Sequence, residues 1–220
     1  MKYYPINLDI TDKRCVVLGG GAVAERKVES LLKCRGAVTV ISPVLTPRLK
    51  DLLSRGRIQH VGRNYQRGDL DGAFLVFGAT NDSAVNAEAS EEAHKKGTLV
   101  NIVDTPKRCN FIVPSVVDRA DLVMTISTSG KSPALAKKIR KELEVTYGEE
   151  YSIFLTIMGA VRERLLKTGT DSKSNRRAFY RLIQSSMLDL IRGRKKEGVN
   201  TILKDILGEG YSLDELRITF

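Results

Sequence analysis

For its 220 residues the chain contains few cysteines, few histidines and no tryptophan. The three cysteines, Cys15, Cys34 and Cys109, are odd in number and widely spaced, and they form no CxxC pair. This pattern argues against a disulfide framework or a cysteine zinc site and favours reduced thiols. The two histidines, His60 and His94, are too few for a histidine-rich metal site. We place neither of them near the carboxyl ends of the strands predicted below. We therefore predict no metal site and a cytoplasmic protein.

The sequence also lacks a long apolar run. No stretch approaches the roughly 18–20 apolar residues that a membrane-spanning helix needs. The first residues, MKYYPINLDITDK, contain no apolar core of a signal peptide. We expect no membrane association.

Acidic residues are outnumbered, since 36 Lys and Arg against 26 Asp and Glu give a net charge of +10. A basic protein attracts anions, although the excess can also serve solubility alone. The sequence contains neither a helix-turn-helix signature nor a basic stripe interleaved with aromatics, so we do not expect nucleic acid as the partner.

What the sequence does contain is a regular alternation of strand-like and helix-like segments up to about residue 104. Short apolar runs predict strands at 14–18, 38–42, 57–61, 73–80 and 98–104. Amphipathic segments predict helices at 22–34, 47–54 and 83–96. Alternation with short connections is typical of a parallel sheet with helices on both faces. We predict an α/β fold with a Rossmann-like parallel-sheet domain over residues 1–106.

The pattern changes after residue 106. Two strand-like runs, NFIVPSVVDR and ADLVMTIST, are separated only by a turn near 119–121, which favours an antiparallel or exchanged arrangement. The next segment, 132–148, predicts a helix with Ser132 as its N-cap, Pro133 in its first position and Gly148 at its end. These elements predict a small α+β segment.

From residue 149 onward the apolar spacing is helical and no strand signal remains. A polar loop is predicted at 168–175, and the last segment, SLDELRITF, is predicted as a short helix and tail. We therefore divide the rest of the chain into the small α+β segment, 107–148, and a C-terminal helical domain, 149–220.

A glycine-rich turn follows the first predicted strand. The spacing Gly19-x-Gly21-x-x-Ala24, between a strand and a helix, matches the dinucleotide-binding fingerprint. Gly19 permits the tight turn, Gly21 lets the backbone approach a pyrophosphate, and Ala24 keeps the helix close to the strand. The N–H groups at the helix N-terminus favour an anion there. A close-packed turn without a ligand is the alternative interpretation.

The end of the second predicted strand lacks the acidic residue that usually holds the ribose of NAD. Ser42 and Pro43 stand in its place, so this position does not decide between NAD and NADP. Arg48 could favour a phosphate, but a solvated helix residue is the simpler interpretation.

Ligands of open α/β sheets bind beyond the carboxyl ends of the strands. That edge contains 19–24, 42–44, Thr80 and Asp104. A carboxylate that faces a nicotinamide can act as a general base, which makes Asp104 a candidate catalytic residue. An aspartate that caps a turn before a proline is an equally good interpretation.

Four segments together resemble the precorrin-2 dehydrogenase family. They are GGGAVAERK (19–27), NIVDTPK (101–107), NFIVPS (110–115) and ISTSGKSPALAKKIRKELE (126–144). That family includes stand-alone enzymes of sirohaem synthesis and the N-terminal module of the fused bacterial sirohaem synthase. The resemblance covers residues 3–165 and implies NAD-dependent oxidation of precorrin-2 to sirohydrochlorin. It also implies a homodimer that exchanges its middle segment, 107–148, which makes that part of the chain a dimerisation segment.

The resemblance also implies roles for individual residues. It places the essential aspartate of the family on Asp104 and cofactor contacts on Ala22, Val23, Pro43 and Val44. Some members also insert iron with the same aspartate, so a bifunctional dehydrogenase and ferrochelatase is an alternative function. A non-catalytic NAD-sensing regulator is a second alternative.

Precorrin-2 is a polycarboxylate, and basic residues are concentrated in two regions of the chain. Residues 160–200 contain eleven Lys and Arg against four acids, and residues 106–141 contain eight against two. We predict that these regions bind the substrate. The candidate substrate residues are Asn110, Ser127, Thr128, Ser129, Lys131, Arg176 and Arg177. For the loop STSGKSP, a plain helix cap is an equally good interpretation, and Thr125 rules out a P-loop.

Overall fold

The computed structural model describes residues 2–167 and 171–220, and it divides into two compact units, Met1–Val113 and Pro114–Phe220. The boundary lies within the predicted middle segment, 107–148. The three-part division derived from the sequence stays a prediction.

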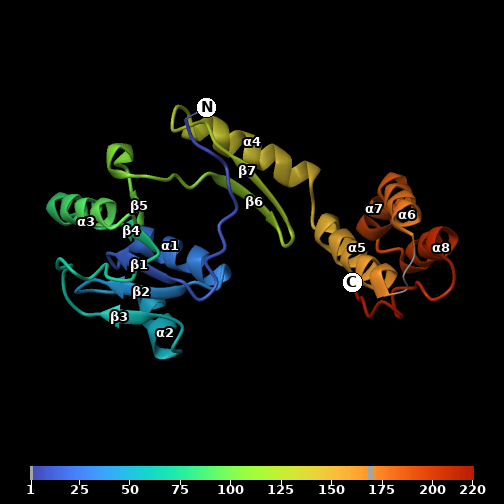
Figure 1. Ribbon diagram of the computed structural model, residues 1–220, viewed down its shortest axis with the longest axis horizontal. Helices are drawn as coiled ribbons and strands as arrows, with labels where there is room; N and C mark the ends of the chain where they lie inside the picture. Colours follow the sequence, from blue (N-terminus) through green and yellow to red (C-terminus); the bar gives the residue numbers. More distant parts are fainter. Residues whose placement is uncertain (1, 168–170) are drawn as a thin grey trace. The chain divides into compact units, whose positions relative to one another are not determined.

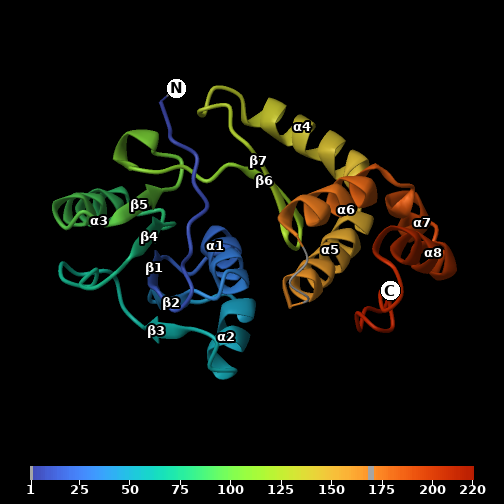
Figure 2. The same cartoon turned by 45° about the vertical axis from the view of Figure 1, so that its right-hand side comes forward.

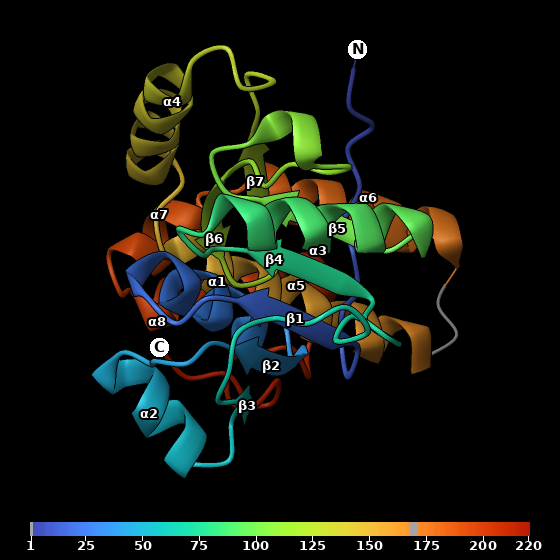
Figure 3. The ribbon, with the colours of Figure 1, turned by 90° about the vertical axis from the view of Figure 1, so that its left-hand side faces the viewer.

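The first unit is built on five parallel strands in the order β3-β2-β1-β4-β5 (Figures 1 and 3). The strands are β1 (Arg14–Leu18), β2 (Ala37–Ile41), β3 (Gln59–Val61), β4 (Leu75–Gly78) and β5 (Leu99–Ile102). Leu18 pairs with both Ile41 and Gly78, and Gly78 pairs with Ile102, so the carboxyl ends of four strands meet at one edge. The order reverses between β1 and β4, which makes that point the expected ligand crevice.

Helices cover both faces of this sheet, as the alternating pattern predicts. Alternate side chains of β1 point to opposite faces of the sheet. Cys15 and Val17 pack with helices α1 (Ala22–Lys33) and α2 (Pro47–Ser54) on one face. Val16 and Leu18 pack with α3 (Ser83–Lys95) on the other face. All four side chains are almost fully buried. Since burial of one such side chain stabilises the fold by about 1.5–3 kcal/mol, the two apolar layers hold the strand ends rigidly in place.

The second unit begins with an antiparallel hairpin of β6 (Ser115–Arg119) and β7 (Leu122–Ile126). Its turn places Ala120 in the left-handed region, at φ 57°. Helix α4 (Pro133–Thr146) follows and is capped by Ser132, whose hydroxyl accepts a hydrogen bond from the Leu135 amide at 3.2 Å. The predicted antiparallel pair and the predicted helix cap are both present.

Four helices complete the second unit (Figure 2). They are α5 (Glu150–Lys167), α6 (Ser172–Gln184), α7 (Met187–Arg192) and α8 (Lys196–Leu207). Their shared core contains Ile157, Val161, Leu182 and Leu203. Among the described residues, no helix combines the length and apolar character that crossing a bilayer requires.

Two predicted details of this region are wrong. Most of the described part of the predicted loop, 168–175, is helical, because Asp171 caps α6 by accepting from the Ser174 amide at 3.2 Å; residues 168–170 lie outside the described residues. The predicted terminal helix, 212–220, is replaced by hydrogen-bonded turns. Leu213 there donates its N–H to the Asn200 side chain at 2.8 Å, a distant partner that the local sequence does not reveal.

Candidate nucleotide-binding and active site

The three adjacent glycines before α1 meet three different environments. Gly19 has φ +108°, and a Cβ atom there would lie 2.4 Å from the Ala79 carbonyl oxygen. A Cβ atom on Gly20 would lie 1.9 Å from the Val44 carbonyl oxygen. At Gly21 a Cβ atom would meet nothing within 4 Å. The backbone therefore packs closely against the neighbouring loops at Gly19 and Gly20, and it is open at Gly21. A turn that binds a pyrophosphate through its backbone needs such an open position.

The helix that starts at this turn has no side-chain cap. Its N-cap is Gly21, which offers no acceptor, whereas Thr46, Asp82, Ser132 and Asp171 cap α2, α3, α4 and α6 with their side chains. The N–H groups of Ala22, Val23 and Ala24 belong to this first turn, where α-helices leave donors without helical partners. Uncapped donors at the positive end of a helix fit the phosphates of a dinucleotide.

Ala24 is fully buried against the sheet. The third position of the fingerprint therefore holds a small residue for the packing reason that the sequence predicts. A larger side chain there would push α1 away from β1 and displace its N–H groups.

The loop after β2 forms one wall of the turn. The Ser42 hydroxyl donates to the Val44 carbonyl at 2.8 Å, and the Thr46 amide donates to the Gly20 carbonyl at 3.0 Å. The Thr46 hydroxyl also donates to the Glu25 carboxylate of α1 at 2.6 Å. Pro43 and Val44 therefore stand on a loop that is fastened to the glycine turn, and the Val44 side chain is 70% exposed.

Arg48 and His60, two residues near this loop, have partners within the protein. Arg48 binds Glu29 at 3.0 Å and Asp51 at 3.2 Å, so it is a paired surface residue. His60 lies 2.8 Å from the Ser42 carbonyl oxygen through Nε2. From the sequence we expect His60 to lie away from the carboxyl ends of the strands, and that expectation is wrong. The short strand β3 pairs with β2 and brings His60 to Ser42.

The loop between β4 and α3 carries Thr80 and is held by Asn86. The Asn86 amide donates to the Thr80 carbonyl at 2.9 Å, and Thr80 accepts from the Asp82 N–H at 3.2 Å. Asn86 is buried, and its Oδ1 would lie 2.7 Å from a Cβ atom on Gly78. Sequence reasoning missed both Asn86 and Gly78, because their relation exists only after β4 and α3 pack together.

Asp104 lies two residues beyond the end of β5, at the same edge as the glycine turn. Its φ is +58°, a left-handed conformation that Asp tolerates better than most residues. Tight backbone bonds flank it: Val103 donates to Gly78 at 2.9 Å and Thr105 donates to Ile102 at 3.2 Å. Asp104 is exposed, and over residues 2–167 and 171–220 its carboxylate takes part in no ion pair. The carboxylate is therefore held at the strand ends and is free to meet a ligand.

Asn110 has a structural role along the free edge of β5. Its Oδ1 accepts from the Val100 N–H at 2.7 Å, and its Nδ2 donates to the Thr98 carbonyl at 2.8 Å. Cys109 similarly accepts from the Ile102 N–H through Sγ at 3.1 Å. These side chains pair an edge that would otherwise be open. Both polar groups of Asn110 are thereby used, and its role in substrate binding stays a prediction.

The other candidate substrate residues belong to the second unit. In the loop before α4, Ser127 accepts from the Ser129 amide at 3.2 Å and Thr128 accepts from the Ser132 amide at 3.1 Å. These bonds order the loop around the left-handed Ser129, and Lys131 is exposed. Arg176 and Arg177 are exposed on α6. The first unit thus gathers 19–24, 42–44, Thr80 and Asp104 at one edge, and the remaining candidates stay predictions.

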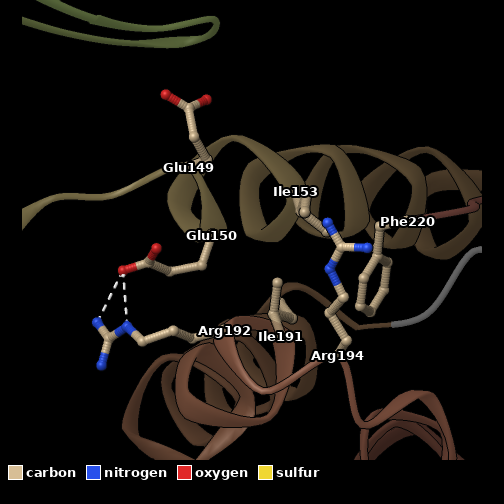
Figure 4. A pocket seen from close by; sticks show the side chains of 7 residues that line it. All are labelled: Glu149, Glu150, Ile153, Ile191, Arg192, Arg194 and Phe220. Carbon is tan, nitrogen blue, oxygen red and sulfur yellow. Dashed lines mark hydrogen bonds and ion pairs between the residues drawn. The ribbon is translucent and has the colours of Figure 1, made fainter.

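The second unit also contains a pocket of about 330 Å³ that holds none of the predicted site residues. It is lined by Glu149, Glu150, Ile153, Ile191, Arg192, Arg194 and Phe220 (Figure 4). Glu150 Oε1 accepts two bonds from Arg192, at 2.7 and 3.2 Å. Burial acts to raise the pKa of Glu150, but the hydrogen bonds from Arg192 and the backbone outweigh it, so the pKa is lowered. This pair ties the start of α5 to α7.

Comparison with known proteins places the chain in a family. A family model described as "Putative NAD(P)-binding" matches residues 6–115, which is half of the chain. The chain belongs to this family. A second model, described as "Sirohaem biosynthesis protein central", matches residues 121–146. NAD(P) is therefore the class of cofactor, as the glycine turn predicts.

Individual relatives agree with these matches. Siroheme synthase of Photobacterium profundum is 38% identical over 191 residues, which are 87% of this chain and 41% of that protein. Siroheme synthase of Methylobacillus flagellatus is 36% identical over 216 residues, which are 96% of this chain and 45% of that protein. The chain thus spans less than half the length of these curated relatives.

A solved structure is similar over nearly its whole length. SirC, precorrin-2 dehydrogenase, superposes with a TM-score of 0.79 at 25% identity, and the match covers 93% of this chain and 98% of SirC. The resemblance to the precorrin-2 dehydrogenase family and the Rossmann-like fold, both expected from the sequence, are confirmed.

Proposed function

We propose that the chain catalyses the NAD-dependent dehydrogenation of precorrin-2 to sirohydrochlorin. Membership of an NAD(P)-binding family and the likeness to SirC, precorrin-2 dehydrogenase, support this function. The observation that carries it is the position of Asp104, an exposed carboxylate at the same sheet edge as the uncapped N-terminus of α1. The proposed nucleotide cradle and the candidate base thus belong to one compact unit.

The chemistry divides between the cofactor and the chain. Bound NAD supplies the acceptor for a hydride, which carries two electrons away from the substrate. A carboxylate oxygen of Asp104 accepts the proton that the substrate loses in the same oxidation. The first turn of α1 binds the pyrophosphate through its N–H groups, and the loop 42–46 supports the neighbouring nucleoside.

The partners and location belong to the same proposal. The basic residues Lys131, Arg176 and Arg177 bind substrate carboxylates, and two chains form a homodimer through the segment 107–148. The described cysteines are all free thiols, which suits action in the cytoplasm. On the described residues, no observation favours ferrochelatase activity or a non-catalytic regulator over the dehydrogenase.

A turnover assay tests the proposal directly. The protein, NAD and precorrin-2 are mixed under anaerobic conditions, and NADH and the sirohydrochlorin spectrum should appear together. Omitting NAD should abolish the reaction. Addition of ferrous or cobaltous ion to sirohydrochlorin without NAD tests the bifunctional alternative in the same experiment. Binding of NADH without any turnover of precorrin-2 would favour the regulator instead.

Replacement of Asp104 tests the assigned base. Asp104→Asn should lower kcat by about 100- to 10,000-fold, the range that a general base contributes. Asn also tolerates the left-handed conformation, so the fold should remain intact. NADH binding should match that of the wild-type protein in a fluorescence titration. Unchanged kcat in this variant would show that Asp104 is only a turn residue.

A further inference from the structure

Lys27 is a half-buried cation in the second turn of α1, at the edge of the glycine-turn motif. Its ammonium group lies 5.0 Å from the centroid of the Phe77 ring. Phe77 is 5% exposed and precedes the last residue of β4. The Phe111 ring packs edge-on against Phe77 at a centroid distance of 5.7 Å. Lys27 therefore stands over an aromatic pair on the β4 side of α1.

The carboxylates of α1 are engaged away from Lys27. Glu25 accepts from Thr46, and Glu29 pairs with Arg48 of α2, so both are used toward the β2 side. No carboxylate of residues 2–167 or 171–220 lies within ion-pair distance of the Lys27 ammonium. Within the described part of the chain, the Lys27 ammonium therefore faces the Phe77 ring and has no carboxylate partner.

Burial makes this arrangement costly for the protein. Burial, followed by the nearby charge of Arg26, lowers the pKa of Lys27. The face of the Phe77 ring attracts a cation above it and offsets only part of this cost. A methionine of similar length would cover Phe77 without any such cost. A charge kept at this position therefore needs a reason other than packing.

The position of Lys27 relative to the sheet indicates that reason. Long side chains on a helix lean toward its N-terminus, which here is the pyrophosphate cradle at Gly21. The ring below the ammonium belongs to the end of β4, one side of the point where the strand order reverses. Dinucleotides of this fold lie across that point, and the substrate meets them there.

We propose that Lys27 binds an anionic group of a ligand in this crevice, either a phosphate of the dinucleotide or a carboxylate of the tetrapyrrole. The inference rests on the proposed function for the identity of the tetrapyrrole, but not for the phosphate. Lys27 is then a binding residue of the site, added to the backbone groups of Ala22–Ala24.

Two variants on the same helix test the proposal. Lys27→Met removes the charge and keeps the cover over Phe77, and Lys33→Met removes the same charge from the exposed last turn of α1. The affinity for NADH is measured by fluorescence titration, and that for sirohydrochlorin by absorbance titration. Lys27→Met should weaken one of the two affinities by about tenfold or more, the usual worth of a charged hydrogen bond. Lys33→Met should change neither.

The outcome separates the two sources of the anion. A weaker affinity for NADH assigns the cofactor phosphate, and a weaker affinity for sirohydrochlorin assigns the substrate carboxylate. Lys27→Arg should restore most of the lost affinity. If both affinities of Lys27→Met equal those of the wild-type protein, Lys27 only covers the ring and the proposal is wrong. If Lys27→Met does not fold, Lys27→Gln is judged by the same two titrations.

The titrations also separate this inference from the proposed function. Lack of precorrin-2 turnover by the wild-type protein would overturn the dehydrogenase function. The effect of Lys27→Met on NADH binding would still show whether Lys27 binds a phosphate of the dinucleotide, because that measurement needs no turnover.

Discussion

Gly19, Gly20 and Gly21 are adjacent in the chain, yet each is a glycine for a different physical reason. Gly19 adopts a left-handed φ of +108°, which side chains rarely allow. Gly20 lies against the Val44 carbonyl, which the loop after β2 brings to it. Gly21 has an ordinary φ of −89° and open space around it. Only Gly21 is therefore free of any requirement from the protein itself.

This difference leads to a prediction for Gly21→Ala. The fold should keep a stability close to that of the wild-type protein, because the gain of about 0.4–1 kcal/mol from a glycine-to-alanine change at a compatible position offsets the lower preference for alanine at a helix N-cap. The added methyl group stands in the predicted pyrophosphate cradle, so the Kd for NADH should rise at least about tenfold, which corresponds to about 1.4 kcal/mol. Thermal unfolding measures the first effect, and fluorescence titration measures the second.

Gly19→Ala is the matched comparison. Here the left-handed backbone and the approach to the Ala79 carbonyl should cost about 1–3 kcal/mol of folding free energy, the usual range for a strained residue. Its Tm should fall whether or not NADH is present. Wild-type affinity for NADH in Gly21→Ala would show that the pyrophosphate does not use this turn.

At the scale of elements, the helices and strands of the first unit follow from local patterns. The strand VTVIS is rich in β-branched apolar residues because both faces of a parallel sheet are buried. Helix α2 spans Pro47–Ser54, the range that the sequence predicts. The bonds of Asn110 to β5 could not be predicted, because its partners are chosen by the packed sheet. The hydrogen bond from Asn86 to Thr80 and the close approach of Gly20 to the loop 42–46 also depend on the packed sheet, so the sequence does not predict them.

The Glu150–Arg192 pair provides an element-scale prediction on pH. Its lowered pKa means that Glu150 stabilises the folded state above its ordinary pKa of 4.5, and that this stability is lost as the pH falls through the lower folded-state pKa. Glu150→Gln should therefore reduce the free energy of unfolding by about 1–2 kcal/mol at pH 7.

The difference between the two proteins should shrink once the pH is below 4.5. Denaturant unfolding of both proteins at several pH values measures it. Asp189→Asn is the control, because Asp189 binds the same Arg192 at 3.1 Å but is 77% exposed. A difference that is constant across the acid range would mean that packing, not ionisation, explains the effect of Glu150.

At the scale of the whole molecule, part of the positive charge of the chain is carried by exposed side chains that have no acidic partner within the described chain. Lys131, Arg176 and Arg177 are all exposed, and no described carboxylate forms an ion pair with them. The net charge of +10 visible in the sequence therefore includes cations that the fold leaves for other molecules. The composition predicts that the chain attracts anions, but it does not predict which anion binds. The exposed cations have no acidic partner in the described structure that would indicate their role.

The proposed homodimer should depend on one face of the β6–β7 hairpin. Val116 pairs with Thr125 and Val123 pairs with Asp118, so both valines stand on the same face, where they are 40% and 50% exposed. The opposite face carries the buried Val117. This face thus carries two exposed valines beside Thr125 and Asp118, and apolar side chains in water favour burial against a second copy.

Val123→Glu should therefore convert a dimer into a monomer, since it places a charge in the proposed interface. Sedimentation equilibrium should give twice the chain mass for the wild-type protein and a single chain mass for the variant. Leu166→Glu is the control, because Leu166 is 69% exposed on α5, outside the segment 107–148. The proposed interface is wrong if Val123→Glu remains dimeric. If the wild-type protein is itself a monomer, the homodimer is wrong, and the exposed valines need another partner.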